Sequence, residues 1–136
     1  MYEVKTKKAP GTNYSEVYES VFGLYAIIRK KTKRRPYIRS AYFNKDKIFL
    51  GIFWSHLHEK LNHRDKTRRL KFFPCALELI QQSRLDPESK ESVDKKSEIL
   101  HRFAGKTKEG EIFFVQIKEE KRNGQKSLIS VFPLEK

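Results

Sequence analysis

Histidine, arginine and lysine side chains gather near the C-terminal end of the chain. His101 and Arg102 lie in one predicted strand, Glu98–Ala104, and Lys118 ends the next, Glu111–Lys118. Histidine accepts and donates protons near neutral pH, and the two cationic types stabilise charge on phosphoryl oxygens. These groups are needed when a 2′-hydroxyl attacks the neighbouring phosphate of RNA without a metal ion. The sequence therefore offers candidates for metal-independent RNA cleavage.

The relative position of these side chains depends on the turn between the two strands. A four-residue turn at Thr107–Gly110 would pair His101 with Gln116, and both would lie beside Lys118 on the face turned away from the core. A shift by one residue would bring Arg102 to that face instead. The sequence leaves both registers open, and it also allows His101 and Arg102 to be ordinary half-exposed strand residues.

Other reactive groups form weaker patterns. Positions two apart on a helix diverge by roughly 200°, so His56 and His58 do not face one metal ion, and no cysteine or paired acid completes a ligand set with His63. Cys75 lies in an apolar helix and is predicted to be a buried thiol. The sequence has no glycine-rich phosphate loop. We therefore predict no metal site and no cofactor.

The charge is strongly positive and unevenly distributed. The 30 lysines and arginines outnumber 17 acidic residues, which gives a formal net charge of +13. The densest basic run spans residues 29–39, and a second cluster spans residues 64–71. Because such self-repulsion destabilises a compact chain, we expect a polyanionic partner, first of all nucleic acid. An anionic membrane or a merely solvated basic surface is the alternative. The predicted nucleic-acid-binding residues are Arg29, Lys30, Lys31, Lys33, Arg34, Arg35, Arg39, Arg64, Arg68 and Arg69.

Histidines and aromatic residues accompany the basic clusters. His58 and His63 lie beside the second cluster, where they could bind phosphate or complete a catalytic site. Tyr37, Tyr42 and Trp54 either stack on unpaired bases or belong to the core. These alternatives depend on where the side chains point, which the sequence leaves open.

Periodicity predicts an α+β fold in a single domain over residues 1–136. Helical spacing dominates residues 13–83, and strand alternation dominates residues 98–134. A polar lead-in over residues 1–12 is followed by Asn13, which is expected to cap a helix that runs to about Lys31. The other expected elements are a hairpin of strands Tyr37–Phe43 and Ile48–Trp54, a helix from Ser55 to about Leu61, a helix from Pro74 to near Ser83, and an exposed loop over residues 84–97.

The C-terminal region is predicted to form an antiparallel sheet with helices covering one face. Its third strand is Ser127–Leu134, and Asn123-Gly124 is a strong hairpin signal. Placed as a two-residue turn, this pair aligns Ile117 with Ser130 and puts Ser130 on the core face. The predicted core-facing residues are Phe113, Val115, Ile117, Leu128, Phe132 and Leu134.

The stretch from His101 to Lys118, followed by Lys126–Pro133, resembles the phage and mobile-element nuclease families grouped with barnase, EndoU, colicin RNases and RelE. The resemblance implies N-terminal helices before a four-stranded antiparallel sheet, with a basic, metal-independent RNase site on that sheet. The long hairpin expected over residues 37–54 has no clear counterpart in the compact toxins of this group. The site residues that the resemblance implies are His101, Arg102, Lys118 and Ser130.

These residues and the resemblance together favour a metal-independent RNA endonuclease, of a toxin or mobile-element kind. A non-catalytic RNA- or DNA-binding module is the alternative, followed by a phage or mobile-element protein-interaction domain. The expected partners are RNA and an acidic inhibitor or antitoxin protein, and no membrane. A single cysteine, the lack of a long apolar segment and an N-terminus without an apolar stretch predict a cytoplasmic protein.

Overall fold

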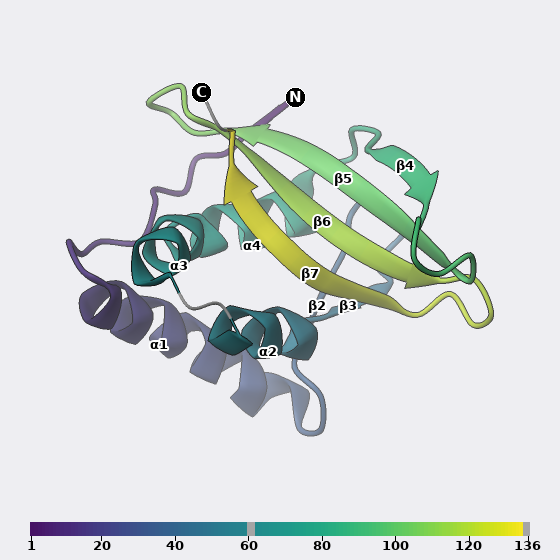
Figure 1. Cartoon of the computed structure of the whole chain (residues 1–136), viewed down its shortest axis with the longest axis horizontal. Helices are drawn as coiled ribbons and strands as arrows, with labels where there is room; N and C mark the ends of the chain where they lie inside the picture. The colour runs from purple at the N-terminus through teal and green to yellow at the C-terminus, as the bar shows by residue number, and fades with distance from the viewer. Residues whose placement is uncertain (60–61, 135–136) are drawn as a thin grey trace.

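The computed structural model describes residues 1–59 and 62–134, and it has a mixed α+β fold (Figure 1). The α+β prediction is therefore confirmed at this level. The side chain of His58 and the expected helix end at Leu61 lie outside what the structure describes. The helices are α1 (Tyr14–Thr32), α2 (Gly51–Glu59), α3 (His63–Leu70) and α4 (Phe73–Gln82). The strands are β1 (Tyr2–Glu3), β2 (Tyr37–Arg39), β3 (Lys47–Phe49), β4 (Glu88–Glu91), β5 (Glu98–Lys106), β6 (Ile112–Glu120) and β7 (Lys126–Pro133).

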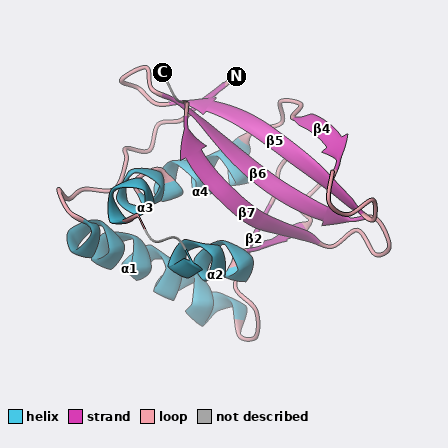
Figure 2. Ribbon diagram, viewed as in Figure 1, coloured by secondary structure: helices cyan, strands magenta, loops and turns pink. Residues whose placement is uncertain are grey.

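The strands form one curled sheet in the order β1-β5-β6-β7-β3-β2, and β4 pairs with the edge of β5. The sheet is mixed, because β1 runs parallel to β5 and β3 runs parallel to β7. The three C-terminal strands are antiparallel as predicted, but the sheet is larger than the three to four strands expected and includes two parallel pairings. The antiparallel strands β5, β6 and β7 form its long central part, and the helices lie to one side of them (Figure 2). Among the described residues, no helix crosses the face of these strands that is turned to the viewer, which we call the open face.

The first helix begins as predicted. The Asn13 side chain accepts a hydrogen bond from the backbone N–H of Glu16, and the Glu16 carboxylate accepts two from Thr12. These bonds satisfy donors that a helix start leaves unpaired. Val17 and Val21 then bury the apolar side of α1 against the core.

Residues 40–70 depart from the prediction. The strands of the expected hairpin shorten to β2 and β3, and the apolar run after Phe49 begins α2, so Ser55 lies within this helix rather than at its start. A short apolar run fits a buried strand or a buried helix equally well, and Phe53 and Leu57, four residues apart, bury one helical side. Residues 63–70 form α3 because Asn62 caps the backbone N–H of Asp65.

Two segments predicted to be unstructured contribute strands. The lead-in over residues 1–12 contains β1, and its Val4 and Ala9 are buried. The loop over residues 84–97 contains β4, whose four residues are all exposed. Neither strand has an apolar alternation, because each is held by backbone pairing with β5 rather than by a buried face.

The β5–β6 turn decides the register that the sequence left open. The backbone N–H of Thr107 donates to the carbonyl of Glu111, which leaves a loop of residues 108–110, and Gly110 has φ +89°. A three-residue loop that ends in a left-handed residue is a common hairpin form. This loop pairs His101 with Ile117 and Arg102 with Gln116. His101 therefore faces the helices, and Arg102 lies on the open face.

The β6–β7 register differs from the predicted one. Gly124 has φ +72° as a hairpin glycine requires, but Glu120 and Gln125 are hydrogen-bonded, so the loop is longer than two residues. This longer loop aligns Ile117 with Leu128, so the predicted pairing of Ile117 with Ser130 is wrong. A bulge at Gln116/Ile117 then inserts one residue of β7, which aligns Gln116 with Ser130 and reverses the predicted faces of the β7 residues that follow.

The bulge changes which residues face the core. Val131 is buried, whereas Phe132 and Leu134, both predicted to face the core, are half-buried and exposed respectively. Ser130, predicted to face the core, aligns with Gln116 on the open face. On the inner face, Phe113 stacks on Phe72 with ring centroids 5.4 Å apart.

None of the helices in the described part of the chain has both the length and the apolar character needed to cross a bilayer.

Candidate nucleic-acid interface

A row of polar side chains crosses the open face. Arg102 on β5 pairs with Gln116 on β6, and Gln116 pairs with Ser130 on β7. Arg102 is exposed, while Gln116 and Ser130 are half-buried. Two of the four site residues predicted from the sequence, Arg102 and Ser130, therefore lie in one row across three neighbouring strands.

Two phenylalanines form the next row of the open face. Phe114 and Phe132 pair across β6 and β7, and their ring centroids are 5.5 Å apart. The guanidinium carbon of Arg102 lies 5.8 Å from the Phe114 ring centroid and 5.6 Å from that of Phe132. A second guanidinium, from Arg69 on α3, lies 5.5 Å from the Phe132 centroid. We call these four residues the Arg–Phe platform.

Helix α3 carries Arg69 to the edge of this face. Asp65, one turn earlier, accepts a hydrogen bond from Nε of Arg69 at 2.9 Å, and Nη1 of Arg69 lies 3.5 Å from Oγ of Ser130. The capping bond from Asn62 to Asp65 fixes the start of the same helix. Arg69 is therefore held over β7 by an ion pair within its own helix.

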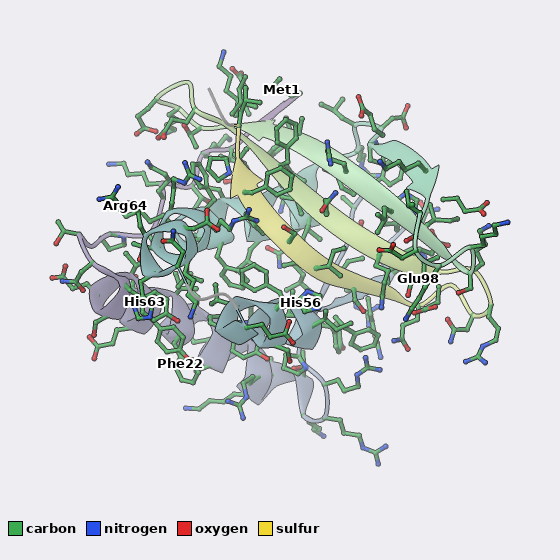
Figure 3. The ribbon with its side chains drawn as sticks, viewed as in Figure 1. Met1, Phe22, His56, His63, Arg64 and Glu98 are labelled. Carbon is green, nitrogen blue, oxygen red and sulfur yellow. The ribbon has the colours of Figure 1, made fainter. Side chains whose placement is uncertain are left out.

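A histidine from α2 also reaches the open face. His56 and Glu59 line a shallow hollow of about 310 Å³ with Ile129 and Ser130 of β7. His56 and Arg69 also line a smaller hollow beside Ser130. His56 is exposed, and Figure 3 shows it beside β7. His56, which can accept and donate a proton, therefore lies next to Ser130, one of the predicted site residues. The sequence had indicated His101 for this role.

His101 lies on the opposite side of the sheet. It is only 7% exposed, and its Nδ1 and Nε2 are hydrogen-bonded to Oγ of Ser89 at 2.6 Å and to Oε1 of Glu119 at 2.8 Å. Its ring packs edge-on against Phe43. Of the two registers that the sequence left open, the structure has the one that brings Arg102, rather than His101, to the face of Lys118, because neighbouring residues of a strand point to opposite faces.

The fourth predicted residue, Lys118, is on the open face but is paired with acids. Its Nζ lies 3.4 Å from a carboxylate oxygen of Glu98 and 3.4 Å from one of Glu120. These carboxylates offset its charge. The open face is therefore acidic around Lys118 and basic around the Arg–Phe platform.

The second basic cluster divides between two surfaces. Arg64, Arg68 and Lys71 line a groove between α3 and the segment before α1, together with Lys8, while Arg69 turns toward the sheet. Positions 64, 68 and 71 share one side of a helix, which explains the division. His63, also predicted for this region, lines the same groove, and its ring packs at an angle of 44° against Tyr14.

The first basic run is spread around the end of α1 and β2. Arg35 lies 4.0 Å from the ring centroid of Phe49 and 3.5 Å from Gln125, and Arg29 lies over Tyr25. Lys31 and Arg39 line a separate cavity. The other predicted residues of this run, all exposed, are Lys30, Lys33 and Arg34. The ten predicted residues are therefore distributed over several parts of the surface.

Of the three aromatic residues singled out from the sequence, Tyr37 is half-buried and lines the same cavity as Lys31 and Arg39, and the other two pack in or against the core. Trp54 is buried among other rings, and Tyr42 packs on Phe43 and Phe103. The aromatic pair on the open face is Phe114 and Phe132, and Phe132 was missed because the predicted register buried it. The bulge that turns Phe132 outward has no signal in the sequence, whereas the Gly110 loop could have shown that Arg102 lies on the open face.

Within residues 1–59 and 62–134, no group of three or more His, Cys, Asp or Glu residues is arranged to hold a metal ion. No protein-family model matches the chain, and no curated protein or solved structure matches it significantly.

Proposed function

We propose that this protein binds single-stranded nucleic acid, RNA foremost, on the Arg–Phe platform. The observation that carries the proposal is a pair of adjacent phenylalanines on the open face of a sheet, overlaid by two guanidinium groups. Aromatic rings on a sheet surface and arginine planes are the groups on which unpaired bases stack. The same arginines attract the phosphates that connect those bases.

The platform favours an unpaired strand over a duplex. A base exposes its face to a phenylalanine ring only when it is free of its own stack, whereas a duplex offers mainly phosphates and groove edges. Each stacked base contributes about 1–3 kcal/mol with little dependence on sequence. We therefore expect tight binding of single strands with weak sequence preference.

Charge suggests a path for the strand. Glu98 and Glu120 surround Lys118 at one end of the open face and would repel phosphates. Arg69 and, on another side of α3, Arg64 continue the positive surface from the platform toward the helix. The proposed path therefore runs from Arg102 across Phe132 toward α3.

A second candidate function is metal-independent RNA cleavage at the same face. The observation that favours it is the hollow shared by His56, Glu59 and Ser130, with Arg69 beside it. His56 and Glu59 would exchange protons with the 2′-hydroxyl and the leaving oxygen, and Arg69 would stabilise charge on the phosphoryl group. With this activity, the protein would be a RelE/barnase-like RNase with a toxin or mobile-element role. An acidic inhibitor protein would then bind over the open face.

Fluorescence anisotropy with a labelled unstructured RNA tests the binding proposal. Phe114→Ala and Phe132→Ala should each weaken binding by about 5- to 150-fold, the loss of one stacking contact. Phe22→Ala is the matched control, because Phe22 is 37% exposed on α1 and lies away from the open face (Figure 3). Equal losses for all three variants, or none for the two platform variants, would contradict the proposal.

Incubation of RNA with the protein and EDTA tests the cleavage candidate. If His56 transfers a proton, His56→Ala should slow cleavage by about 10²–10⁴-fold, while His63→Ala, on the far side of α3, should not. If the protein binds RNA tightly but leaves it intact under every metal condition, the cleavage candidate is refuted and only the binding function stands.

A further inference from the structure

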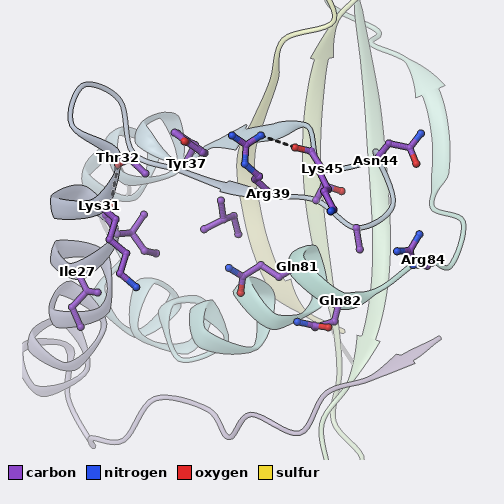
Figure 4. Close-up of a pocket in the computed structure, with 14 residues that line it drawn as sticks. Ile27, Lys31, Thr32, Tyr37, Arg39, Asn44, Lys45, Gln81, Gln82 and Arg84 are labelled. Carbon is purple, nitrogen blue, oxygen red and sulfur yellow. Dashed lines mark hydrogen bonds between the residues drawn. The ribbon is translucent and has the colours of Figure 1, made fainter.

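A cavity of about 740 Å³ lies on a different part of the molecule from the open face. It is enclosed by the last turns of α1, by β2 and the turn after it, and by the end of α4 (Figure 4). In this view the Lys31 side chain from α1 and the Gln81 side chain from α4 extend into the same gap. Its volume falls within the range typical of small-molecule sites.

All the charged residues that line the cavity are basic. Lys31 comes from α1, Arg39 and Lys45 from β2 and the turn after it, and Arg84 from the segment after α4, and none of the lining residues is acidic. Among the described residues, neither Lys31 nor Arg84 makes an ion pair with a carboxylate. Four cations lining one cavity, with no acid among the lining residues, favour an anion with more than one charge.

The other residues that line the cavity would also contact an uncharged, aromatic part of a ligand. Ile28 and Ile38 provide an apolar floor, and the Tyr37 ring forms part of the wall. The amide side chains of Asn44, Gln81 and Gln82 also line the cavity and make no hydrogen bond within the described residues. Amides both donate and accept, which suits the edge of a nucleobase, and a tyrosine ring suits its face.

The wall made by the turn after β2 is held in place. Nη1 of Arg39 donates to the carbonyl of Lys45 at 2.9 Å, and the backbone N–H of Ala41 donates to the carbonyl of Ile80 at the end of α4. Asn44 and Lys45 both have positive φ, 55° and 68°, which non-glycine residues adopt only where surrounding contacts impose it.

The same turn is held from the sheet side. Nζ of Lys126 donates to the carboxylate of Asp46 at 2.9 Å, and Phe43 packs between Lys126 and His101. The cavity wall is therefore organised before a ligand arrives, which lowers the entropic cost of binding.

From this arrangement we infer that the cavity binds a nucleotide, with its phosphates among the four cations and its base against Tyr37 and the amides. The nucleotide is either free or the phosphorylated end of a nucleic acid strand. The inference does not depend on the Arg–Phe platform, which lies on the open face of the sheet.

Isothermal titration calorimetry tests the inference with ATP, GTP, adenosine and tripolyphosphate as probes. ATP or GTP should bind more tightly than either tripolyphosphate or adenosine, because only a nucleotide fills both the cationic and the apolar parts. Lys31→Ala and Arg84→Ala, both at exposed positions, should each weaken this binding about tenfold or more. Lys108→Ala, an exposed lysine of the β5–β6 loop, is the matched control, and Phe132→Ala should bind nucleotide as the unaltered protein does.

RNA with a 5′-phosphate and the same RNA with a 5′-hydroxyl distinguish the two sources. A preference for the 5′-phosphate that Arg84→Ala abolishes would assign the cavity to a strand end, and nucleotide binding without this preference would assign it to a free nucleotide. Tripolyphosphate binding as tightly as ATP, no binding of any nucleotide, or Lys108→Ala weakening binding as much as Arg84→Ala would overturn the inference. Circular dichroism of each variant confirms that it is folded.

Discussion

Replacing His101 with alanine should destabilise the fold rather than remove a catalytic group. The ring makes hydrogen bonds of 2.6 Å to Ser89 and 2.8 Å to Glu119, and it supports Phe43. A hydrogen bond contributes about 0.5–1.5 kcal/mol, or about 1.5–3 kcal/mol when one partner is charged, so His101→Ala should lower the free energy of unfolding by about 2–4 kcal/mol. The lost ring packing adds to the same direction.

Urea denaturation followed by circular dichroism measures this loss. Arg102→Ala is the matched control, since Arg102 is the exposed neighbour on the open face and its replacement should change stability by no more than about 0.5 kcal/mol. Ser89→Ala, which removes one of the two hydrogen bonds, should fall between them. An unchanged unfolding midpoint for His101→Ala, combined with loss of RNA cleavage, would refute the structural role and restore the catalytic one.

Three further predictions concern the turn, the thiol and the N-terminal segment. Gly124→Val should destabilise the protein by about 1–2 kcal/mol in urea denaturation, since φ is +72° and no atom crowds the position, and Gly124→Asn should cost less; equal stability of the two variants would contradict this. Burial and the nearby Glu78 raise the pKa of the Cys75 thiol to about 11. A thiol reagent at neutral pH should therefore modify Cys75 only as fast as the protein unfolds, and rapid modification of the native protein would contradict the burial of this thiol. Burial and the hydrogen bond to Glu78 raise the pKa of Tyr2 to about 12 from 10.0. The contribution of Tyr2 to the free energy of unfolding should therefore be complete below pH 10 and lost between pH 10 and 12. Unfolding curves measured at increasing pH should show this loss for the unaltered protein and not for Tyr2→Phe.

Long periodic segments were predictable because many residues carry the same signal. The helix that begins after Asn13 and the three C-terminal strands lie within a few residues of the predicted ranges. Their apolar faces are set by repeated burial of side chains, which the sequence displays directly. The polar, exposed strand β4 and the two-residue strand β1 have no such repetition, and they are held by backbone pairing with β5 and by single side-chain hydrogen bonds such as those of Ser89 and Tyr2.

The candidate site was less predictable because it depends on register. The Gly110 loop and the bulge at Gln116/Ile117 each shift a strand by one residue, and one residue exchanges the two faces of a sheet. As a result His101 moved to the inner face, while Phe132 and Ser130 moved to the open face. The residue types of a nucleic-acid site were visible in the sequence, but the loop conformations that bring them together were not.

Photo-crosslinking of a 5-bromouridine-substituted RNA, followed by mass spectrometry of the peptides, tests the nucleic-acid site most directly. Binding on the Arg–Phe platform predicts crosslinks in β6 and β7 at Phe114 and Phe132, with further sites on α3 near Arg69. Crosslinks confined to residues 29–39, with β6 and β7 unlabelled, would contradict binding on the open face.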